Sequence, residues 1–398
     1  MGKYVLVTGG ELKNKGAQAM TFITVDEIKK RYPDKEVILL SDIDYKRPDE
    51  IKDNYRFTIR PFPKKLTVLQ SKLASLVYKS IKKNASFNKF CDILSQSDAL
   101  IDVSGYTYGS NWGTRHSFYF LLRIKMANAW KIPVYIMPQS FGPFDFKGKH
   151  APFVRFLSKH ELKKAKVIMA REVEGKKGLE ENFKLKNVVL TPDLVLQSKG
   201  IDLNNIYKTI PSLYDCDVPK GSVAVIPNSK NIKYSNEDTA YGMYKLLIDR
   251  LLEKQKSVFL IYHSSEDLEV CKKLKEKYYN SNVVCVENEL SCIEFERLVE
   301  KFDFVVASRY HSIVHSYKMS IPAIILGWSV KYSELSEKFD QSRFCFDIKN
   351  SNAEETVLEQ IDYMCENYRA ESEKIGRSLE KIQSGSVYDY VKLNGSDC

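Results

Sequence analysis

Long apolar runs are missing from this sequence of 398 residues, and no stretch approaches the roughly 20 apolar residues that a membrane-spanning helix needs. The first residues, Met1-Gly2-Lys3, lead directly into a short apolar stretch, without the longer apolar core and cleavage site of a signal peptide. We therefore expect a strand at the start of the chain and a cytoplasmic protein.

Paired cysteines are also missing. The eight cysteines are scattered along the chain, and none forms a C-x-x-C pair or another metal-ligand spacing. Cysteines of this kind are typical of reduced, mostly buried thiols in a reducing compartment. The sequence therefore predicts neither a disulfide framework nor a metal site.

Acidic residues are outnumbered by basic ones, 51 to 61, which leaves a formal net charge of +10. An excess of positive charge suits nucleic acid, an anionic membrane surface or a phosphorylated substrate. The basic residues are spread over the whole chain, and no RNP, zinc-finger or helix-turn-helix signature accompanies them. We therefore expect no nucleic-acid partner.

Short apolar runs alternate with longer amphipathic stretches along most of the chain. Strands are expected at residues 4–7, 37–40, 99–103, 134–137, 167–170 and 188–190 in the first half, and at residues 223–227, 258–262, 283–286, 304–307 and 323–326 in the second half. Helical patterns lie between these runs. The sequence therefore predicts an α/β fold with parallel sheets that are covered on both faces.

The alternation weakens near residues 197–220, where glycine, proline, aspartate and asparagine gather, and this is the best linker candidate. The chain then divides into an N-terminal Rossmann-like domain over residues 1–200 and a C-terminal one over residues 215–350. Residues 351–398 are expected to form a helical segment that packs back across the N-terminal domain. Two such domains facing a cleft form a glycosyltransferase-B-like architecture, with ligands at the carboxyl ends of the strands.

The most informative segment follows the apolar run at residues 304–307 and reads Ser308-Arg309-Tyr310-His311-Ser312. Ser308 is a good N-cap residue, so a helix is expected to start here with Arg309 and His311 in its first turn. The start of a helix favours an anion, arginine offers a planar fork for phosphate or carboxylate, and histidine moves protons near neutral pH. The alternative is a capped helix with a surface arginine and histidine. We favour the anion site, because a cation at this end of a helix is otherwise unfavourable.

Other polar side chains are expected just after strands, where residues of this fold face the cleft. They are His263 and Asp267 in the second half, and Ser104-Gly105, Gln139 and Arg171 in the first half. Each of these residues also has a simpler interpretation. Asp267 could be an acidic residue that the dipole favours in the first turn of a helix, and Arg171 could form an ion pair with Glu172. The segments around Ser104-Gly105 and Gln139 could be tight turns that need small residues. Both interpretations stay open for Asp267 and Arg171, and a ligand role is favoured for Gln139.

Several landmarks occur in a fixed order. Near the C-terminus, Arg309-Tyr310-His311 is followed by Ile321-Pro322, an apolar run and Lys331. Near the N-terminus, a Gly9-Gly10 turn is followed by Asn14-Lys15-Gly16-Ala17. Between them lie Asp102-Val103-Ser104-Gly105, Pro138-Gln139-Ser140-Phe141-Gly142-Pro143, Ala170-Arg171-Glu172 and Pro192-Asp193. Over residues 5–336 this ordered set resembles the polysaccharide pyruvyl transferase family, although the family more often has Gly-Asp where this chain has Gly16-Ala17, which leaves the acceptor open.

The resemblance implies transfer of the enolpyruvyl unit of phosphoenolpyruvate to two hydroxyls of a sugar, which forms a cyclic ketal and releases phosphate. The acceptor would be an activated or lipid-linked sugar in capsule, exopolysaccharide or cell-wall assembly, and no metal or organic cofactor is implied. Implied donor contacts are Arg171, His263, Arg309, Tyr310, His311, Ser312 and Lys331, and implied acceptor contacts are Asn14, Lys15, Ser104, Gly105, Gln139 and Asp193.

Within that chemistry His311 is the expected general acid, which protonates the methylene carbon of the donor, and it could equally bind the phosphate. Arg309 and Lys331 would hold the donor's carboxylate and phosphate, and His263 or Asp193 would serve as the base for the sugar hydroxyls. Two alternatives remain: a nucleotide-sugar glycosyltransferase on the same scaffold, and a non-catalytic sugar- or phosphate-binding protein.

A basic segment at residues 63–83 has apolar residues at positions 66, 69, 73, 76, 77 and 81, which is a helical spacing. An amphipathic basic helix can lie on an anionic leaflet, and it would bring the protein to the inner face of the membrane, near a lipid-linked sugar. The alternative is a helix that packs its apolar side on the domain core. We favour core packing, because that is what such stripes usually indicate.

Overall fold

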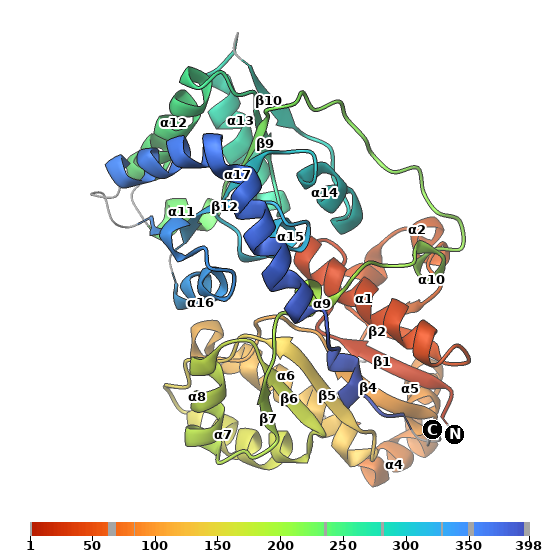
Figure 1. Cartoon of the computed structure of the whole chain (residues 1–398). Helices are drawn as coiled ribbons and strands as arrows, with labels where there is room; N and C mark the ends of the chain where they lie inside the picture. Colours follow the sequence, from red (N-terminus) through yellow and green to blue (C-terminus); the bar gives the residue numbers. More distant parts are fainter. Residues whose placement is uncertain are drawn as a thin grey trace.

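The computed structural model describes residues 2–62, 69–82, 84–234, 237–279, 282–327, 329–348 and 354–393. Figure 1 shows two α/β domains joined by a long extended linker and by the C-terminal helix. Each domain contains one parallel sheet, which confirms the predicted α/β class with two Rossmann-like domains.

The N-terminal domain has a seven-stranded parallel sheet in the order β3-β2-β1-β4-β5-β6-β7. Its strands are β1 (Tyr4–Thr8), β2 (Glu36–Leu40), β3 (Thr58–Arg60), β4 (Ser97–Asp102), β5 (Val134–Gln139), β6 (Val167–Ala170) and β7 (Val188–Leu190). Its helices are α1 (Lys15–Arg31), α2 (Asp49–Asp53), α4 (Lys72–Lys82), α5 (Ala85–Ser95), α6 (Gly113–Ala129), α7 (Ala151–Glu161), α8 (Val173–Phe183), α9 (Leu194–Gln197) and α10 (Leu203–Ile206). Apolar side chains of α1 cover one face of the sheet, and those of α5, α6, α7 and α8 cover the other.

The C-terminal domain repeats this plan with a six-stranded parallel sheet in the order β10-β9-β8-β11-β12-β13. Its strands are β8 (Val223–Ile226), β9 (Val258–Ile261), β10 (Val283–Val286), β11 (Phe304–Ala307), β12 (Ala323–Gly327) and β13 (Cys345–Asp347). Its helices are α11 (Ser229–Tyr234), α12 (Glu237–Glu253), α13 (Leu268–Glu276), α14 (Cys292–Val299), α15 (Tyr310–Lys318), α16 (Val330–Lys338) and α17 (Glu354–Ile382). In both sheets the strand order reverses beside the first strand, which is where ligands bind in such folds.

Two edge strands were not among the predicted ones. β3 and β13 have three residues each, too few to show an alternating pattern. Each pairs in parallel with the neighbouring strand, β2 or β12, so their extended conformation follows from sheet pairing. A strand this short cannot be predicted from its own sequence, because its conformation depends on pairing with the neighbouring strand.

The long helix α17 belongs to both domains. Its first half places Val357, Ile361 and Met364 in the core of the C-terminal domain, whereas Ile375 and Leu379 lie in a cluster shared with the N-terminal domain. Beyond the helix, the Tyr388 hydroxyl lies 2.8 Å from that of Thr24 on α1. Figure 1 shows the helix running from one domain to the other, so the end of the chain joins them a second time.

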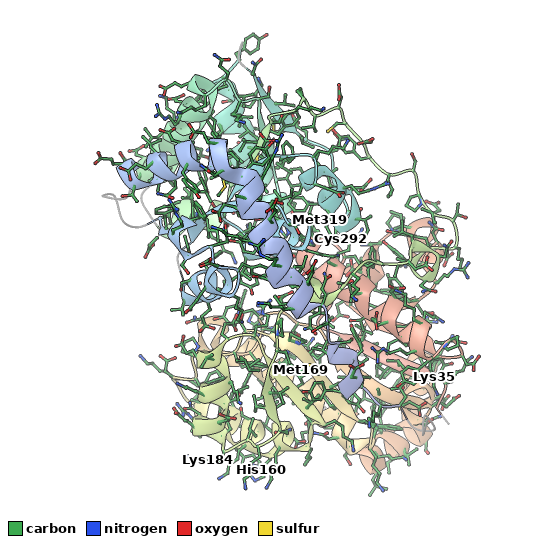
Figure 2. All side chains as sticks on the ribbon, in the orientation of Figure 1. Lys35, His160, Met169, Lys184, Cys292 and Met319 are labelled. Atoms are coloured by element: carbon green, nitrogen blue, oxygen red, sulfur yellow. The ribbon has the colours of Figure 1, made fainter. Side chains whose placement is uncertain are left out.

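A single buried apolar cluster crosses the domain boundary. It includes side chains of α1 from the N-terminal domain and of α14 and α15 from the C-terminal domain. The backbone amide of Cys292, which Figure 2 labels between the domains, donates a 2.6 Å hydrogen bond to the side chain of Gln18. This packing holds the start of α1 against the start of α15.

The basic segment at residues 63–83 is partly described, and residues 63–68 and 83 lie outside the described part of the chain. Its helix, α4, does not pack its apolar stripe on the core as expected: Leu73, Leu76 and Val77 are 74%, 46% and 50% exposed. The helix is turned so that Ser75 is buried and Tyr78 contacts Phe87. Among the described helices, none is long and apolar enough to cross a membrane.

Candidate active site

The loops that follow β1, β4, β8 and β11 meet between the domains, at the two points where strand order reverses. They enclose a cavity of about 320 Å³. Nine of the residues predicted to form the site line it: Asn14, Ser104, Gly105, Arg171, His263, Arg309, Tyr310, His311 and Lys331. The other four, Lys15, Gln139, Asp193 and Ser312, are buried behind the lining.

The start of α1 forms one wall of the cavity. Asn14 is its N-cap, and the side-chain oxygen of Asn14 accepts hydrogen bonds from the amides of Gly16 and Ala17. A Cβ on Gly16 would lie only 2.3 Å from Cγ of His311, so a glycine is needed for this close approach of the two domains. The Asn-x-Gly pattern therefore serves both to start the helix and to make room for His311.

Lys15 connects the domains behind this wall. Its Nζ donates a 3.1 Å hydrogen bond to the carbonyl oxygen of His263 and lies 4.6 Å from the ring centroid of Tyr262. Burial lowers the pKa of Lys15 to about 8. Lys15 thus contributes positive charge near the cavity without lining it.

Arg171 is the centre of a buried network on the N-terminal side, and its side chain is only 3% exposed. Its guanidinium pairs with Asp193 and donates to the hydroxyl of Ser140 at 2.6 Å and to the carbonyl of Gly105 at 3.0 Å. Burial alone would raise the pKa of Asp193, but Arg171 and His311 lower it below its usual value. Arg171 therefore both lines the cavity and compensates a buried carboxylate, which combines the two roles that the sequence left open.

Gln139 was expected to contact a ligand, but the structure places it beneath the cavity floor. It is fully buried, and its Nε2 donates a 3.3 Å hydrogen bond to Asp102. Asp102 also accepts from Thr8 and from the amide of Ser104, so this group ties the ends of β1, β4 and β5 together. Gln139 thus supports the loop on which Ser104 lines the cavity.

Arg309 departs from the expected geometry in two ways. It is itself the N-cap residue of α15, while the hydroxyl of Ser308 lies 2.8 Å from the hydroxyl of Tyr244 instead of capping the helix. Its guanidinium is held by Asp267, with hydrogen bonds of 2.8 and 2.6 Å, and by Glu266. The positive charge of Arg309 is therefore largely matched by two carboxylates, and buried Asp267 orients it.

His311 lies where the two domains touch. Its Nε2 is 3.8 Å from Asp193 Oδ2 and has no hydrogen-bond partner among the described residues. Burial lowers the pKa of His311 to about 3, against the opposing effect of the Asp193 carboxylate. The imidazole is therefore neutral, and its Nε2 is available for a ligand. Ser312, which follows it, is buried and donates to the carbonyl of Arg309.

Lys331 reaches the cavity from the start of α16. Its ammonium lies over three aromatic rings, those of Tyr106, Tyr310 and Tyr332, at 5.2 to 5.6 Å from their centroids. Burial lowers its pKa to about 7, and the positive charge of Arg171 adds to this shift. A partly buried cation whose pKa is lowered in this way gains from an anionic ligand.

His263 follows β9 and is only 1% exposed. Neither ring nitrogen has a hydrogen-bond partner among the described residues, and its ring contacts those of Phe295 and His315. Burial holds its pKa well below the usual value, so the ring is neutral. A neutral buried imidazole with open nitrogens can accept a proton.

Several lining residues were not among those predicted from the sequence, notably Tyr106, Trp112, Asn228 and Lys230. Lys230 extends over the ring of Trp112 across the cleft, at 5.7 Å from its centroid. The available signal was its place just after β8, at the reversal point of the second sheet. Together with Arg171, Arg309 and Lys331 it gives the lining four basic side chains, with Glu11 as the one acidic lining residue in the described part of the chain.

This arrangement suits a small ligand with several negative charges. No group of three or more histidine, cysteine, aspartate or glutamate side chains that could hold a metal ion occurs among the described residues. The cations approach from both domains, and two neutral imidazoles face the same space. The cavity can therefore bind an anion and offer proton-transfer groups beside it.

Solved structures of other proteins share the fold. A mutant of Staphylococcus aureus TarM, in complex with fondaparinux, alpha-GlcNAc-glycerol and UDP, matches with a TM-score of 0.58 and 10% identity, over 98% of each chain. The UDP-GlcNAc 2-epimerase from Methanocaldococcus jannaschii matches with a TM-score of 0.56 and 11% identity, over 96% of this chain and 99% of that one. Identities this low show a common glycosyltransferase-B-like architecture and nothing about substrates.

Family comparison is more specific. No curated protein matches the chain in sequence. Residues 14–330, however, match the family described as polysaccharide pyruvyl transferase. The match begins at Asn14, the cap of α1, and ends at Val330, one residue before Lys331, so it spans both walls of the cavity. The chain belongs to the polysaccharide pyruvyl transferase family, a family of transferases.

Proposed function

We propose that this protein transfers the enolpyruvyl unit of phosphoenolpyruvate to an activated or lipid-linked sugar, forming a pyruvate ketal in the assembly of a bacterial surface polysaccharide in the cytoplasm. The observation that carries the proposal is the cationic cavity with two neutral histidines in a chain of this family. Phosphoenolpyruvate carries a carboxylate and a phosphate, and both need cations.

The donor is held mainly from the C-terminal side. Lys331 and Lys230 approach the cavity from the starts of α16 and α11, and the amino end of α15 adds its positive dipole. Asp267 and Glu266 contact Nε and Nη2 of Arg309, so Nη1 is the nitrogen that Arg309 would offer to the donor. Arg171 extends the same positive field from the N-terminal side, and its charge also faces the ring of Tyr310 at 4.6 Å.

His311 is the proposed general acid. A neutral imidazole is a poor acid, so it must gain a proton when the donor binds; the donor's negative charges favour this by raising its pKa from about 3. Protonation of the donor's methylene carbon then creates an oxocarbenium-like centre at the adjacent carbon. A sugar hydroxyl adds there, phosphate leaves with its bonding electrons, and the second hydroxyl closes the ketal.

The base for the sugar hydroxyls is His263 in preference to Asp193. His263 lines the cavity and is neutral with open nitrogens. Asp193 is engaged by Arg171 and is buried behind the cavity lining, so it is less accessible to a sugar hydroxyl. In this proposal Asp193 positions Arg171 and His311, and His263 accepts the proton.

The acceptor approaches from the N-terminal side, where Asn14, Ser104 and Gly105 line the cavity. Lys15 and Gln139 support this wall from behind. Ala17 also lines it, at the position where the family more often has aspartate. The acceptor of this chain therefore meets one carboxylate fewer than the acceptors of those relatives.

Phosphoenolpyruvate is expected to raise the melting temperature of the purified protein, because a ligand that binds only the folded state stabilises it once its concentration exceeds Kd. The shift should be lost or strongly reduced in Lys331→Met. Differential scanning fluorimetry with phosphoenolpyruvate, UDP-sugars and GDP-sugars checks this. A shift with a nucleotide sugar alone would replace pyruvyl transfer by the glycosyltransferase alternative.

Donor affinity is expected to fall as the pH rises above about 7, by up to about tenfold per pH unit, because Lys331 has a pKa of about 7 before the donor binds and loses its charge there. Below pH 7 the ammonium is charged and the affinity is highest. The donor phosphate does not itself titrate in this window, since phosphate monoesters have a second pKa of about 6. Calorimetric titration at several pH values measures the slope, which should be smaller in Lys331→Arg, whose side chain stays charged. An equal slope in both proteins would contradict this assignment.

A further inference from the structure

The outer faces of α6 and α7 expose large aromatic side chains. Tyr119 on α6 is 49% exposed, and Phe153 and Phe156 on α7 are 49% and 55% exposed. The inner faces of the same helices are fully packed, with Phe120 and Val154 completely buried. The exposed rings are therefore not needed to fill the core of the domain, and exposed apolar side chains that cluster in this way are typical of an interaction site.

The charged side chains that α6 and α7 themselves carry are almost all basic. α6 carries Arg115, Arg123 and Lys125, and α7 carries Arg155 and Lys159. The single acidic residue of the two helices, Glu161, is buried and accepts hydrogen bonds from Asn128 and Lys164. The exposed side of α6 and α7 therefore presents cations without a compensating carboxylate of their own.

The rings and cations form one continuous surface. Phe118 lies 5.7 Å from Phe153 and 6.1 Å from Tyr119 between ring centroids, which joins α6 to α7. The guanidinium of Arg115 lies over the ring of Tyr119. We call this the α6–α7 surface and define it by Arg115, Tyr119, Phe153, Arg155, Phe156 and Lys159.

The α6–α7 surface begins at the mouth of the active-site cavity. Trp112 immediately precedes α6, lines the cavity and contacts the ring of His116 one helical turn along. α7 follows the loop after β5, whose carboxyl end also lies at the cleft. The helices then run away from the cleft, and Figure 2 shows His160, near the end of α7, at the far edge of the domain.

We propose that the α6–α7 surface docks on an anionic lipid bilayer. Aromatic rings partition into the boundary between headgroups and acyl chains, while lysine and arginine are attracted to acidic headgroups. Side chains that project from the outer faces of two helices suit a flat bilayer, whereas a single nucleic-acid strand is bound in a groove.

Docking by this surface would hold the cavity mouth beside the membrane, where a lipid-linked sugar is presented. The inference goes beyond the proposed pyruvyl transfer and does not depend on it, because membrane binding requires neither donor nor acceptor. It also differs from the helix at residues 63–83 considered from sequence, since the main contacts come from α6 and α7.

Flotation of the full chain tests the proposal, with vesicles of phosphatidylcholine alone and of phosphatidylcholine mixed with phosphatidylglycerol. We expect binding to the mixed vesicles only, weakened by salt. Two double variants, Phe153→Ser/Phe156→Ser and Arg155→Glu/Lys159→Glu, should each reduce it at least tenfold. Matched controls in the C-terminal domain are Tyr279→Ser for the rings and Lys245→Glu/Lys273→Glu for the charges, and both should bind like the unchanged protein.

All substituted side chains are exposed, so the variants should fold, and a melting temperature equal to that of the unchanged protein verifies this without lipid or donor. An unchanged melting temperature together with lost flotation supports the proposal. Flotation of the α6–α7 variants at the level of the unchanged protein would overturn it, and so would a failure of the unchanged protein to bind mixed vesicles. Binding to a single-stranded oligonucleotide without vesicle binding would assign the surface to nucleic acid instead.

Discussion

Replacement of His311 by alanine is expected to lower the rate of pyruvyl transfer by about 10²–10⁴-fold while the protein stays folded, because general acid catalysis contributes an effect of this size. The ring makes no hydrogen bond through Nε2 in the described structure, so its removal leaves no buried partner unsatisfied there. Phosphate release from phosphoenolpyruvate, in the presence of candidate nucleotide-linked and lipid-linked sugars, measures the rate.

The control for this variant is His150→Ala, which removes an exposed histidine at the N-cap of α7 and should leave the rate unchanged. Donor binding separates the two possible roles of His311. A preserved thermal shift with phosphoenolpyruvate, alongside the lost rate, indicates proton transfer, whereas loss of both indicates a phosphate ligand. Full activity in His311→Ala would remove the mechanism proposed here.

Arg309 needs a milder substitution than alanine. Its removal would leave Asp267, which is fully buried, without its ion-pair partner. Arg309→Lys keeps the charge and loses the two-point contact with the Asp267 carboxylate, so it is the more informative variant for donor binding.

Replacement of Arg171 by methionine is expected to lower the free energy of unfolding by about 3–5 kcal/mol, because it leaves the Asp193 carboxylate buried without its counter-charge. Asp193 is only 2% exposed, and the hydroxyl of Ser140 and the carbonyl of Gly105 lose a donor as well. The melting temperature should fall by roughly 6–20 °C for a domain of this size. Thermal unfolding followed by circular dichroism measures it.

The matched variant is Arg171→Met/Asp193→Asn, which removes the buried negative charge together with the positive one. It should recover a large part of the stability, and the difference between the single and double variants gives the coupling energy of the pair. Equal melting temperatures for Arg171→Met and the double variant would mean that Arg171 stabilises the protein through its other contacts. Activity should stay low in both, since the cation that faces Tyr310 is absent.

Much of the architecture could be predicted because it depends on local patterns. Apolar runs of four or five residues marked the central strands, and each predicted core strand is present in the structure. Asn14 and Gly16 marked the start of α1 for reasons that reside in the segment itself: a capping side chain and the lack of a Cβ. Local patterns did not predict the edge strands β3 and β13 or the orientation of α4, because each of these depends on contacts with a neighbouring element.

The chemistry of individual site residues could be predicted only in part. The pattern placed Arg309 just after a strand, but it did not reveal that Asp267, 42 residues earlier, pairs with it. That contact exists because β9 and β11 both flank β8, so the segments after them lie close together. Similarly, Gln139 had the right position for a ligand contact, and only the packing of Asp102 against it shows that it supports the floor.

The sequence by itself determined the fold class, the family and the set of polar residues after the strands, since these follow from local periodicity and from short motifs in order. Only the tertiary structure decided which of those residues face the cavity and what charge they carry. Lys331 has a pKa of about 7 because it is partly desolvated and because Arg171 approaches it from the other domain. Desolvation and charge coupling of this kind are sums over neighbours in space, and distance along the chain does not predict them.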